Sequence, residues 1–284
     1  MKNLVSIIIP TKNRRDLLAL AIDSCLRQTY ALIEVIVVDG ASTDGTEAYV
    51  RSLTDARIVY VRQTTAQGFV SGLNDGFAAA KGAYLTWSSD DDLCAPEAIA
   101  TMAGVLNEEP GVDFVYTDYW MMDAEGKVLY PGRVEAPEGL DQDNYVGHCF
   151  LYRRAVYASL GEYRAAYFLV EDYEYWLRVR EHFTMKRLNT PLYYHRRHPS
   201  ALTAIHGPDK MLAAVAAVRK PYIAAWKHHF LVAGWHYHAG RKGLSLAHAL
   251  MALWLRPWHA PAWRLAALDI LPASGVAFLR RLRK

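Results

Sequence analysis

LVSIIIPTKNR, residues 4–14, starts as an apolar run rich in β-branched residues and turns polar after Pro10. Similar apolar runs end in polar turn residues at three later places, and the four runs cover residues 4–10, 34–39, 57–62 and 84–88. The segments between them carry apolar residues at helical spacing, as at Leu17, Leu18, Ala21, Ile22, Cys25 and Leu26. This strand–helix alternation predicts an α/β fold with a Rossmann-type, mostly parallel sheet flanked by helices.

Polar clusters follow three of the predicted strands, at residues 10–14, 39–45 and 88–92. In open parallel sheets, ligands bind beyond the carboxyl ends of the strands, where loops and helix amino-termini converge. These clusters are therefore the first candidates for a binding site. Beyond residue 110 we expect a strand over residues 114–120, a turn-rich stretch, and helices over residues 153–160 and 173–182.

The composition is that of a globular protein with an enzyme-sized core, since 52% of the 284 residues are hydrophobic and 21% are charged. Three cysteines without C-x-x-C spacing argue against a disulfide framework or a zinc site and favour a reducing, cytoplasmic location. The first ten residues do not resemble a signal peptide. Because no apolar stretch of about eighteen residues is uninterrupted, we expect no spanning helix.

Charge divides the chain after Ala204. Residues 1–204 carry 20 Lys+Arg against 27 Asp+Glu, a net −7, whereas residues 205–284 carry 12 against 2, a net +10. This asymmetry predicts an α/β domain over residues 1–204 and a basic, amphipathic helical extension over residues 205–284. The tryptophan-containing helices of residues 211–284 fit peripheral contact with an anionic membrane and equally fit a subdomain packed on the first domain. Nucleic acid is a weaker option, because no binding module accompanies the charge.

Asp90, Asp91 and Asp92 stand together directly after the fourth apolar run. Like charges this close repel, so a divalent cation is their natural partner, and hard oxygen ligands suit Mg²⁺ or Mn²⁺. An isolated acidic triplet is more often a solvated loop or a helix cap. Its place at the end of a predicted strand favours the metal.

Asp39 ends a buried-looking strand, and we expect its carboxylate near the crevice, where it could bind a base or a ribose; an Asx-turn that ends the strand explains it equally well. Thr11 and Asn13 carry the same ambiguity. Gly68 and Asn74 belong to a glycine-rich helix start that could admit a phosphate, although such glycines are more often packing residues. Neither a P-loop nor a dinucleotide-binding motif is present in the sequence.

A second carboxylate cluster, Glu171, Asp172 and Glu174, precedes or begins an amphipathic helix. A carboxylate there could act as a general base, or Asp172 could simply cap the helix. His195 and His198 could complete a metal site, with ordinary surface histidine as the alternative. His148 is expected to be a packed residue rather than a ligand.

In this order, IIIPTKNR, VVDGASTDGT, SSDDDLCAP and EDYEYWLR resemble the motifs of family 2 glycosyltransferases over about residues 4–204. Members of that family have the GT-A fold and are inverting enzymes that use nucleotide sugars, so the resemblance implies both properties here. It implies metal ligation by Asp92 and Asp90, to which His198 is added as the candidate histidine ligand, and an acceptor-side catalytic pair of Asp172 and Glu171, in which Asp172 is the base and Glu174 its rival. It also implies a nucleotide site, made of Pro10, Thr11, Asn13, Arg14, Asp39, Gly68, Asn74 and Asp91.

The activity implied by the resemblance is Mn²⁺- or Mg²⁺-dependent transfer of a sugar, with a UDP-sugar favoured, to a glycan or lipid-linked acceptor in cell-surface polysaccharide or glycolipid synthesis. Its location would be cytoplasmic, or peripheral on the inner face of the membrane. Two alternatives remain at this point. A sugar nucleotidyltransferase also needs a metal and a nucleotide crevice, and a non-catalytic carbohydrate-binding scaffold could keep the fold without needing both Asp92 and Asp172.

Overall fold

The first apolar run forms the central region of a seven-stranded sheet in the computed structural model, which describes residues 3–270. In sheet order the strands are β10 (Met185–Leu188), β6 (Phe114–Thr117), β9 (Cys149–Arg153), β4 (Tyr84–Trp87), β1 (Val5–Thr11), β2 (Ile33–Asp39) and β3 (Ile58–Arg62). Neighbouring strands are parallel except that β9 runs antiparallel to both β4 and β6. The mostly parallel sheet is therefore confirmed.

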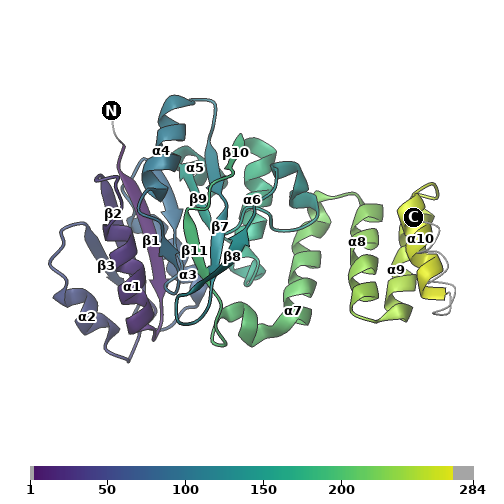
Figure 1. Cartoon of the computed structure of the whole chain (residues 1–284), viewed down its shortest axis with the longest axis horizontal. Helices are drawn as coiled ribbons and strands as arrows, with labels where there is room; N and C mark the ends of the chain where they lie inside the picture. Colours follow the sequence, from purple (N-terminus) through teal and green to yellow (C-terminus); the bar gives the residue numbers. More distant parts are fainter. Residues whose placement is uncertain (1–2, 271–284) are drawn as a thin grey trace. The chain divides into compact units, whose positions relative to one another are not determined.

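Helices cover both faces of this sheet (Figure 1). Those before residue 190 are α1 (Arg15–Leu26), α2 (Thr46–Ser52), α3 (Phe69–Ala79), α4 (Ala98–Glu108), α5 (Arg154–Leu160) and α6 (Glu171–His182), with 3₁₀ turns η1 (Pro137–Asp141) and η2 (Ala165–Tyr167). Because side chains alternate along a strand, Ile7 packs with Leu18 of α1 and Met102 of α4, whereas Ile8 faces α3. A Cβ atom on Gly76 of α3 would lie 2.3 Å from Cγ2 of Ile8, so this glycine permits a close approach of helix and strand.

A second sheet of four strands lies beyond the first, in the order β5 (Leu93–Cys94), β11 (Tyr193–Arg196), β7 (Tyr119–Met122) and β8 (Val128–Gly132). The single strand predicted over residues 114–120 was wrong, because β6 and β7 belong to different sheets. Asp118 separates them: its backbone N–H bonds the carbonyl of Leu188, its carbonyl accepts from Leu192, and its carboxylate accepts from Val134. These bonds fix the point at which the chain passes from β6 in the first sheet to β7 in the second.

The carboxyl-terminal region is helical, as expected, with α7 (Leu202–Arg219), the 3₁₀ turn η3 (Lys220–Tyr222), α8 (Ala225–His238), α9 (Lys242–Leu255) and α10 (Ala260–Ile270). Helix α7 is kinked at Gly207, whose φ is 74° and which precedes Pro208. The chain divides into two compact units, residues 1–211 and residue 212 onward. The predicted extension begins at residue 205, and its basic end, residues 280–284, lies outside the described residues. No helix among residues 3–270 is both long and apolar enough to span a membrane.

Candidate active site

Asp90 joins two of the polar clusters that follow the strands. Its carboxylate accepts a hydrogen bond from Oγ1 of Thr11 at 2.7 Å. It also forms an ion pair with Nη1 of Arg14 at 3.1 Å. Burial raises the pKa of Asp90 to about 6, and the neighbouring charge of Asp91 acts in the same direction while Arg14 and Thr11 oppose it. Asp90 therefore ties the loop after β4 to the loop after β1, and its oxygens already have partners.

Asp91 contacts two cationic or protonatable side chains. Its Oδ2 atom lies 2.7 Å from Nη1 of Arg14 and 2.9 Å from Nε2 of His198. Burial alone would raise the pKa of Asp91, but hydrogen bonds from Ser89 and His198 and the charge of Arg14 outweigh it and lower that pKa. Asp91 is thus held as a carboxylate, and a nitrogen and an oxygen 2.9 Å apart are spaced as two ligands of one metal ion would be.

Asp92 is more deeply enclosed and pairs with a different histidine. Its Oδ1 atom accepts the backbone N–H of Arg196 at 2.7 Å, and its Oδ2 atom lies 3.1 Å from Nδ1 of His195. The ring of His148 stacks on that of His195 with centroids 3.7 Å apart. Ligand atoms of Asp92, His148 and His195 all lie within 4.8 Å of one another, so this trio is a second place that could hold an ion. Burial and the nearby His195 hold the pKa of His148 well below its usual value, which keeps that ring neutral.

The predicted metal set of Asp92, Asp90 and His198 is thus divided in the structure. His198 contacts Asp91, which the resemblance assigns to the nucleotide, while Asp92 contacts His195 and Asp90 contacts Arg14. The register of β11 explains the division: His195 lies on that strand beside Met121 of β7, and His198 lies in the loop that follows.

Asp39 is completely buried, although its carboxylate was expected near the crevice. Its Oδ1 atom accepts the backbone N–H of Ser42 at 2.8 Å, and its Oδ2 atom accepts the hydroxyl of Tyr60 at 2.6 Å and Nη1 of Arg62 at 3.2 Å. Asn13, with a φ of 53°, joins the same loop by accepting the backbone N–H of Thr43. These two residues shape the loop after β2 and fix its position beside the loop after β1.

The glycine-rich helix start is α3, and two of its candidate residues have clear structural roles. Gly68 precedes the helix with a φ of 91°, a conformation that favours glycine. The amide of Asn74 donates to the carbonyl of Tyr163 at 2.9 Å and accepts the N–H of the same residue at 3.0 Å. Asn74 therefore fastens α3 to a segment 89 positions later in the chain.

Glu171 and Asp172 lie in the first turn of α6. Asp172 accepts an amide N–H of Asn144 at 2.8 Å on one oxygen and the N–H of Tyr173 at 2.6 Å on the other. Burial raises the pKa of Asp172 against these two bonds. Burial and the adjacent Asp172 raise the pKa of Glu171 to about 8, so Glu171 is largely protonated at neutral pH. Within the described residues, Oε2 of Glu171 and Oδ1 of Asn144 are buried atoms without a hydrogen-bond partner.

Glu174 differs sharply from its two neighbours. It is fully buried, with one oxygen 2.9 Å from Arg164 and the other 2.9 Å from Arg178, and the Arg178 guanidinium also donates to the carbonyls of Leu160 and Glu162. Two arginine side chains thus contact the one buried carboxylate. This arrangement is that of a structural ion pair.

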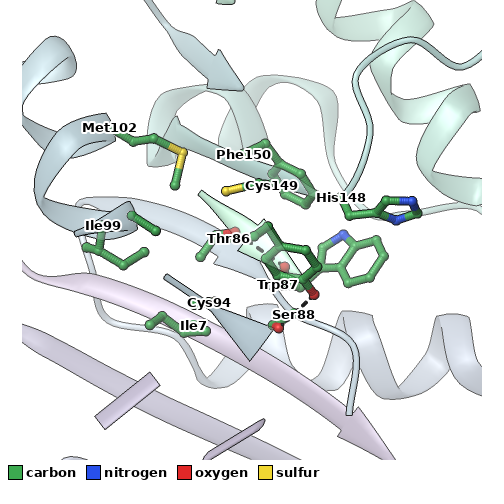
Figure 2. A pocket seen from close by; sticks show the side chains of 12 residues that line it. Ile7, Thr86, Trp87, Ser88, Cys94, Ile99, Met102, His148, Cys149 and Phe150 are labelled. Atoms are coloured by element: carbon green, nitrogen blue, oxygen red, sulfur yellow. Dashed lines mark hydrogen bonds between the residues drawn. The ribbon is translucent and has the colours of Figure 1, made fainter. Parts of the chain in front are cut away.

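Aromatic contacts connect the α6 region with the acidic loop. Trp176 of α6 packs edge-on against Phe150 of β9, with centroids 4.5 Å apart, and Phe150 packs against Trp87 at 5.6 Å. Trp87 is the last residue of β4, directly before the loop that carries the aspartates. Figure 2 shows Trp87, Ser88 and His148 around a small apolar pocket whose lining includes Met102 and Cys149. This pocket is an interior gap between the sheet and α4, lined mainly by carbon and sulfur.

Three site residues were missed or undervalued in the sequence. His148 was expected only to pack, Asn144 lies in a turn-rich stretch without periodicity, and Ser200 accepts Arg14 through its carbonyl at 2.6 Å and bonds His198 through its hydroxyl at 2.7 Å. Of these contacts, only the one between His198 and Ser200 joins residues close in the sequence, so only that one could have been suggested by local spacing. The other contacts join segments that are far apart in the sequence.

The seven-stranded, mostly parallel sheet with polar loops at its carboxyl edge fits the GT-A-like architecture that the resemblance implies. Residues 6–161 match the profile of Glycosyl transferase family 2, which covers more than half of the chain. The chain therefore belongs to glycosyl transferase family 2.

Curated relatives agree with this membership. An uncharacterized glycosyltransferase of Rickettsia typhi is 33% identical over 186 residues, which are 62% of this chain and 58% of that protein. A PGL/p-HBAD biosynthesis glycosyltransferase of Mycobacterium tuberculosis is 30% identical over 178 residues, covering 61% of this chain and 68% of the relative. The chain thus spans a little under three fifths of the Rickettsia protein.

Solved structures show the same fold at low sequence identity. S. aureus TarS 1–349 in complex with UDP-GlcNAc has a TM-score of 0.62 and 15% identity, covering 89% of this chain and 81% of TarS 1–349. The mannosyltransferase PcManGT from Pyrobaculum calidifontis, in complex with GDP-Man and Mn²⁺, has a TM-score of 0.55 and 19% identity, covering 99% of this chain and 79% of PcManGT. These likenesses establish the GT-A-like fold.

Proposed function

We propose that the chain transfers a sugar from a nucleoside diphosphate sugar, with a UDP-sugar favoured, to an acceptor hydroxyl, with inversion at the anomeric carbon. The observation that carries the proposal is the separation of two kinds of carboxylate. Asp91 is paired with Arg14 and His198, as a group that faces a diphosphate and its cation would be. Among the described residues Asp172 accepts hydrogen bonds from neutral donors, Asn144 and the N–H of Tyr173, and its pKa is raised, as that of a base would be.

The residues beside the acidic row fit a divalent cation. Asp91 and His198 offer one oxygen and one nitrogen at ligand spacing, and this mixed set suits Mn²⁺ better than Mg²⁺, which prefers oxygen alone. When bound there, the cation would stabilise negative charge on the departing nucleoside diphosphate. Arg14, which bridges Asp90 and Asp91, would add a fixed positive charge.

A second location for the cation has its own support. Asp92, His195 and His148 bring three ligand atoms together, and Asp92 was the predicted ligand. We favour Asp91 and His198 because Arg14, a cation that could face the diphosphate, contacts Asp91, whereas Asp92 accepts the backbone N–H of Arg196. In this proposal Asp92 and His195 hold the strand β11 in register and so position the loop that carries His198.

We further propose that the loops after β1 and β2 receive the nucleotide. Pro10, Thr11 and Asn13 line the end of β1, and Arg62, 35% exposed, shares the carboxylate of Asp39. Because Asp39 is buried and bonded, it would support binding of the nucleotide base indirectly, by shaping the loop after β2. It would contact the base directly only after a shift of Arg62. Gly68 and Asn74 would contribute by fixing the start and the position of α3.

Asp172 is proposed as the base that takes the acceptor proton. The acceptor oxygen then forms a bond to the anomeric carbon while the bond from that carbon to the phosphate oxygen breaks, and the proton ends on Asp172. Because the pKa of Glu171 is raised to about 8, Glu171 is largely protonated at neutral pH and adds little negative charge beside Asp172. The unpartnered atoms of Glu171 and Asn144 could be satisfied by sugar hydroxyls, since buried polar atoms are normally paired.

The acceptor is proposed to be a glycan or a lipid-linked saccharide in cell-surface polysaccharide or glycolipid synthesis. The M. tuberculosis relative is named for PGL/p-HBAD biosynthesis, which is a consistent precedent. Three free cysteines, two of them buried, fit a cytoplasmic location. Residues 211–284, with their excess of basic residues, are proposed to bring the enzyme to the inner face of a membrane.

The test is a panel of UDP-, GDP- and dTDP-sugars added to the full chain with and without Mn²⁺, followed by thermal unfolding and by assay of transfer or donor hydrolysis. We expect one donor class to raise the unfolding temperature only when Mn²⁺ is present, and UDP-sugars to turn over. Stabilisation without turnover would favour the non-catalytic scaffold. Turnover of a nucleoside triphosphate with a sugar phosphate would favour the nucleotidyltransferase.

A further inference from the structure

Helix α9 carries apolar residues on all sides. No charged residue occurs between Lys242 and Arg256. One side of the helix is buried in the small core shared with α8 and α10, through Ala249, Ala252 and Leu253. The opposite side is exposed and carries large apolar residues, namely Leu244, Leu250, Met251, Trp254 and Leu255. A helix that is apolar all round needs a partner on both sides, so the exposed side lacks one within its own unit among residues 212–270.

The exposed apolar surface continues past the end of α9. Trp254 is 78% exposed, Trp258 in the following turn is 92% exposed, and Trp263 at the start of α10 is 56% exposed. The indole N–H of Trp263 donates to the carbonyl of Pro257 at 2.7 Å, which holds that ring against the turn. We call Leu250, Met251, Trp254, Leu255, Trp258 and Trp263 the tryptophan face. Single exposed apolar residues are ordinary, but six along α9, the following turn and the start of α10 indicate an interaction surface.

The charges around the tryptophan face are positive. Lys242, Arg256 and Arg264 are exposed at the two ends of α9 and on α10, and Arg256 also stacks on the ring of Trp226 at 4.5 Å. Residues 205–284 as a whole carry a net +10. Tryptophan side chains beside exposed lysine and arginine are the composition of helices that lie in a membrane interface, where indoles sit at the headgroup level. The same charge opposes a second copy, since two such faces would bring like charges together.

We propose that the tryptophan face docks onto an anionic lipid bilayer, with α9 lying in the plane of the headgroups and its basic ends against lipid phosphates. The inference rests on the proposed membrane contact of residues 211–284 and gives it a surface and a lipid class. It does not depend on the chemistry of the catalytic site. A docked face would keep the enzyme on the surface where a lipid-linked acceptor is found.

The experiment measures sedimentation of the full chain with vesicles of pure phosphatidylcholine and with vesicles containing about 30% phosphatidylglycerol, a typical anionic surface. The wild type is expected to bind the anionic vesicles. Trp254→Ser with Trp258→Ser should weaken that binding by roughly a hundredfold, because two exposed indoles no longer enter the interface. Val128→Ser with Leu129→Ser is the matched control: these β8 residues are 44% and 47% exposed and lie in the other unit, so binding should not change.

Lys242→Gln with Arg264→Gln tests the charge and should lower binding to anionic vesicles by roughly fivefold per residue. Equal binding of the wild type to both vesicles, or binding to neither, would overturn the proposal. A second outcome would also overturn it: the wild type is a dimer, the Trp254→Ser/Trp258→Ser variant is a monomer, and neither binds vesicles. The tryptophan face would then join two copies of the chain. Nucleotide-sugar binding, measured on the same proteins, should be unchanged in every variant, which separates this proposal from that of the catalytic site.

Discussion

Nε2 of His198 lies 2.9 Å from Oδ2 of Asp91, although the two residues are 107 positions apart in the chain. Arg14 contacts the same carboxylate oxygen and also the carbonyl of Ser200, two residues beyond His198. The loop after β11 is thereby fastened over the loop after β4. This contact turns three separate sequence clusters into one site.

The pairing of His198 with Asp91 predicts unequal effects of the two histidines on metal use. His198→Ala should raise the Mn²⁺ concentration needed for half-maximal activity by roughly ten- to a hundredfold, because a ligand is lost. His195→Ala, the matched variant on the adjoining strand, should lower thermal stability and change the Mn²⁺ requirement much less. The reverse order of effects would place the ion at Asp92, His195 and His148.

Much of this site could be predicted from the sequence, because parallel strands bring their carboxyl ends to one edge. Thr11, Arg14 and the aspartates do meet there. Which histidine faces which aspartate could not be predicted, since that depends on the pairing of β11 with β7 in a second sheet. The burial of Asp39 could not be predicted for a similar reason. It depends on the pairing of β2 with β3, which places Arg62 beside Asp39, where the two side chains form an ion pair. Asn144 had no periodic pattern to mark it.

Glu171 predicts a pH dependence of folding. Its pKa is raised to about 8 in the folded protein, so the folded state holds a proton that the unfolded state releases at lower pH. This contribution to stability is complete below the ordinary pKa of glutamate and is lost as the pH rises through about 8. The free energy of unfolding should therefore fall less between pH 6 and pH 9 in Glu171→Gln than in the wild type. The difference should be roughly the free energy of deprotonating one buried carboxyl group. Parallel unfolding curves for the two proteins would contradict this view of Glu171.

Glu174 predicts a loss of folding rather than of chemistry. Replacing it with glutamine leaves Arg178 buried without its anion, which should lower the free energy of unfolding by about 3–5 kcal/mol. Denaturant unfolding measures this effect, and transfer per folded molecule should stay near the wild-type value. A stable Glu174→Gln protein without transfer activity would make Glu174 the base instead of Asp172.

Two glycines predict opposite responses to the same substitution. Gly76→Ala puts a Cβ atom 2.3 Å from Cγ2 of Ile8, so α3 must move from β1 and stability should fall by about 1–3 kcal/mol. Gly104→Ala in α4 meets nothing within 4 Å and should stabilise by about 0.5–1 kcal/mol through helix propensity. Thermal unfolding of both variants checks the pair. Equal effects would mean that α3 and β1 are not in close contact.

The central claim is that Asp172 removes the acceptor proton at a place separate from the metal and the nucleotide. The most direct measurement compares Asp172→Asn with the wild type in two assays, Mn²⁺-dependent binding of the nucleotide sugar and single-turnover transfer. Asparagine keeps the shape and can still accept the bond from Asn144, so binding should be unchanged while transfer falls by roughly a hundred- to ten-thousandfold. Transfer at the wild-type rate in Asp172→Asn, with binding intact, would contradict the account.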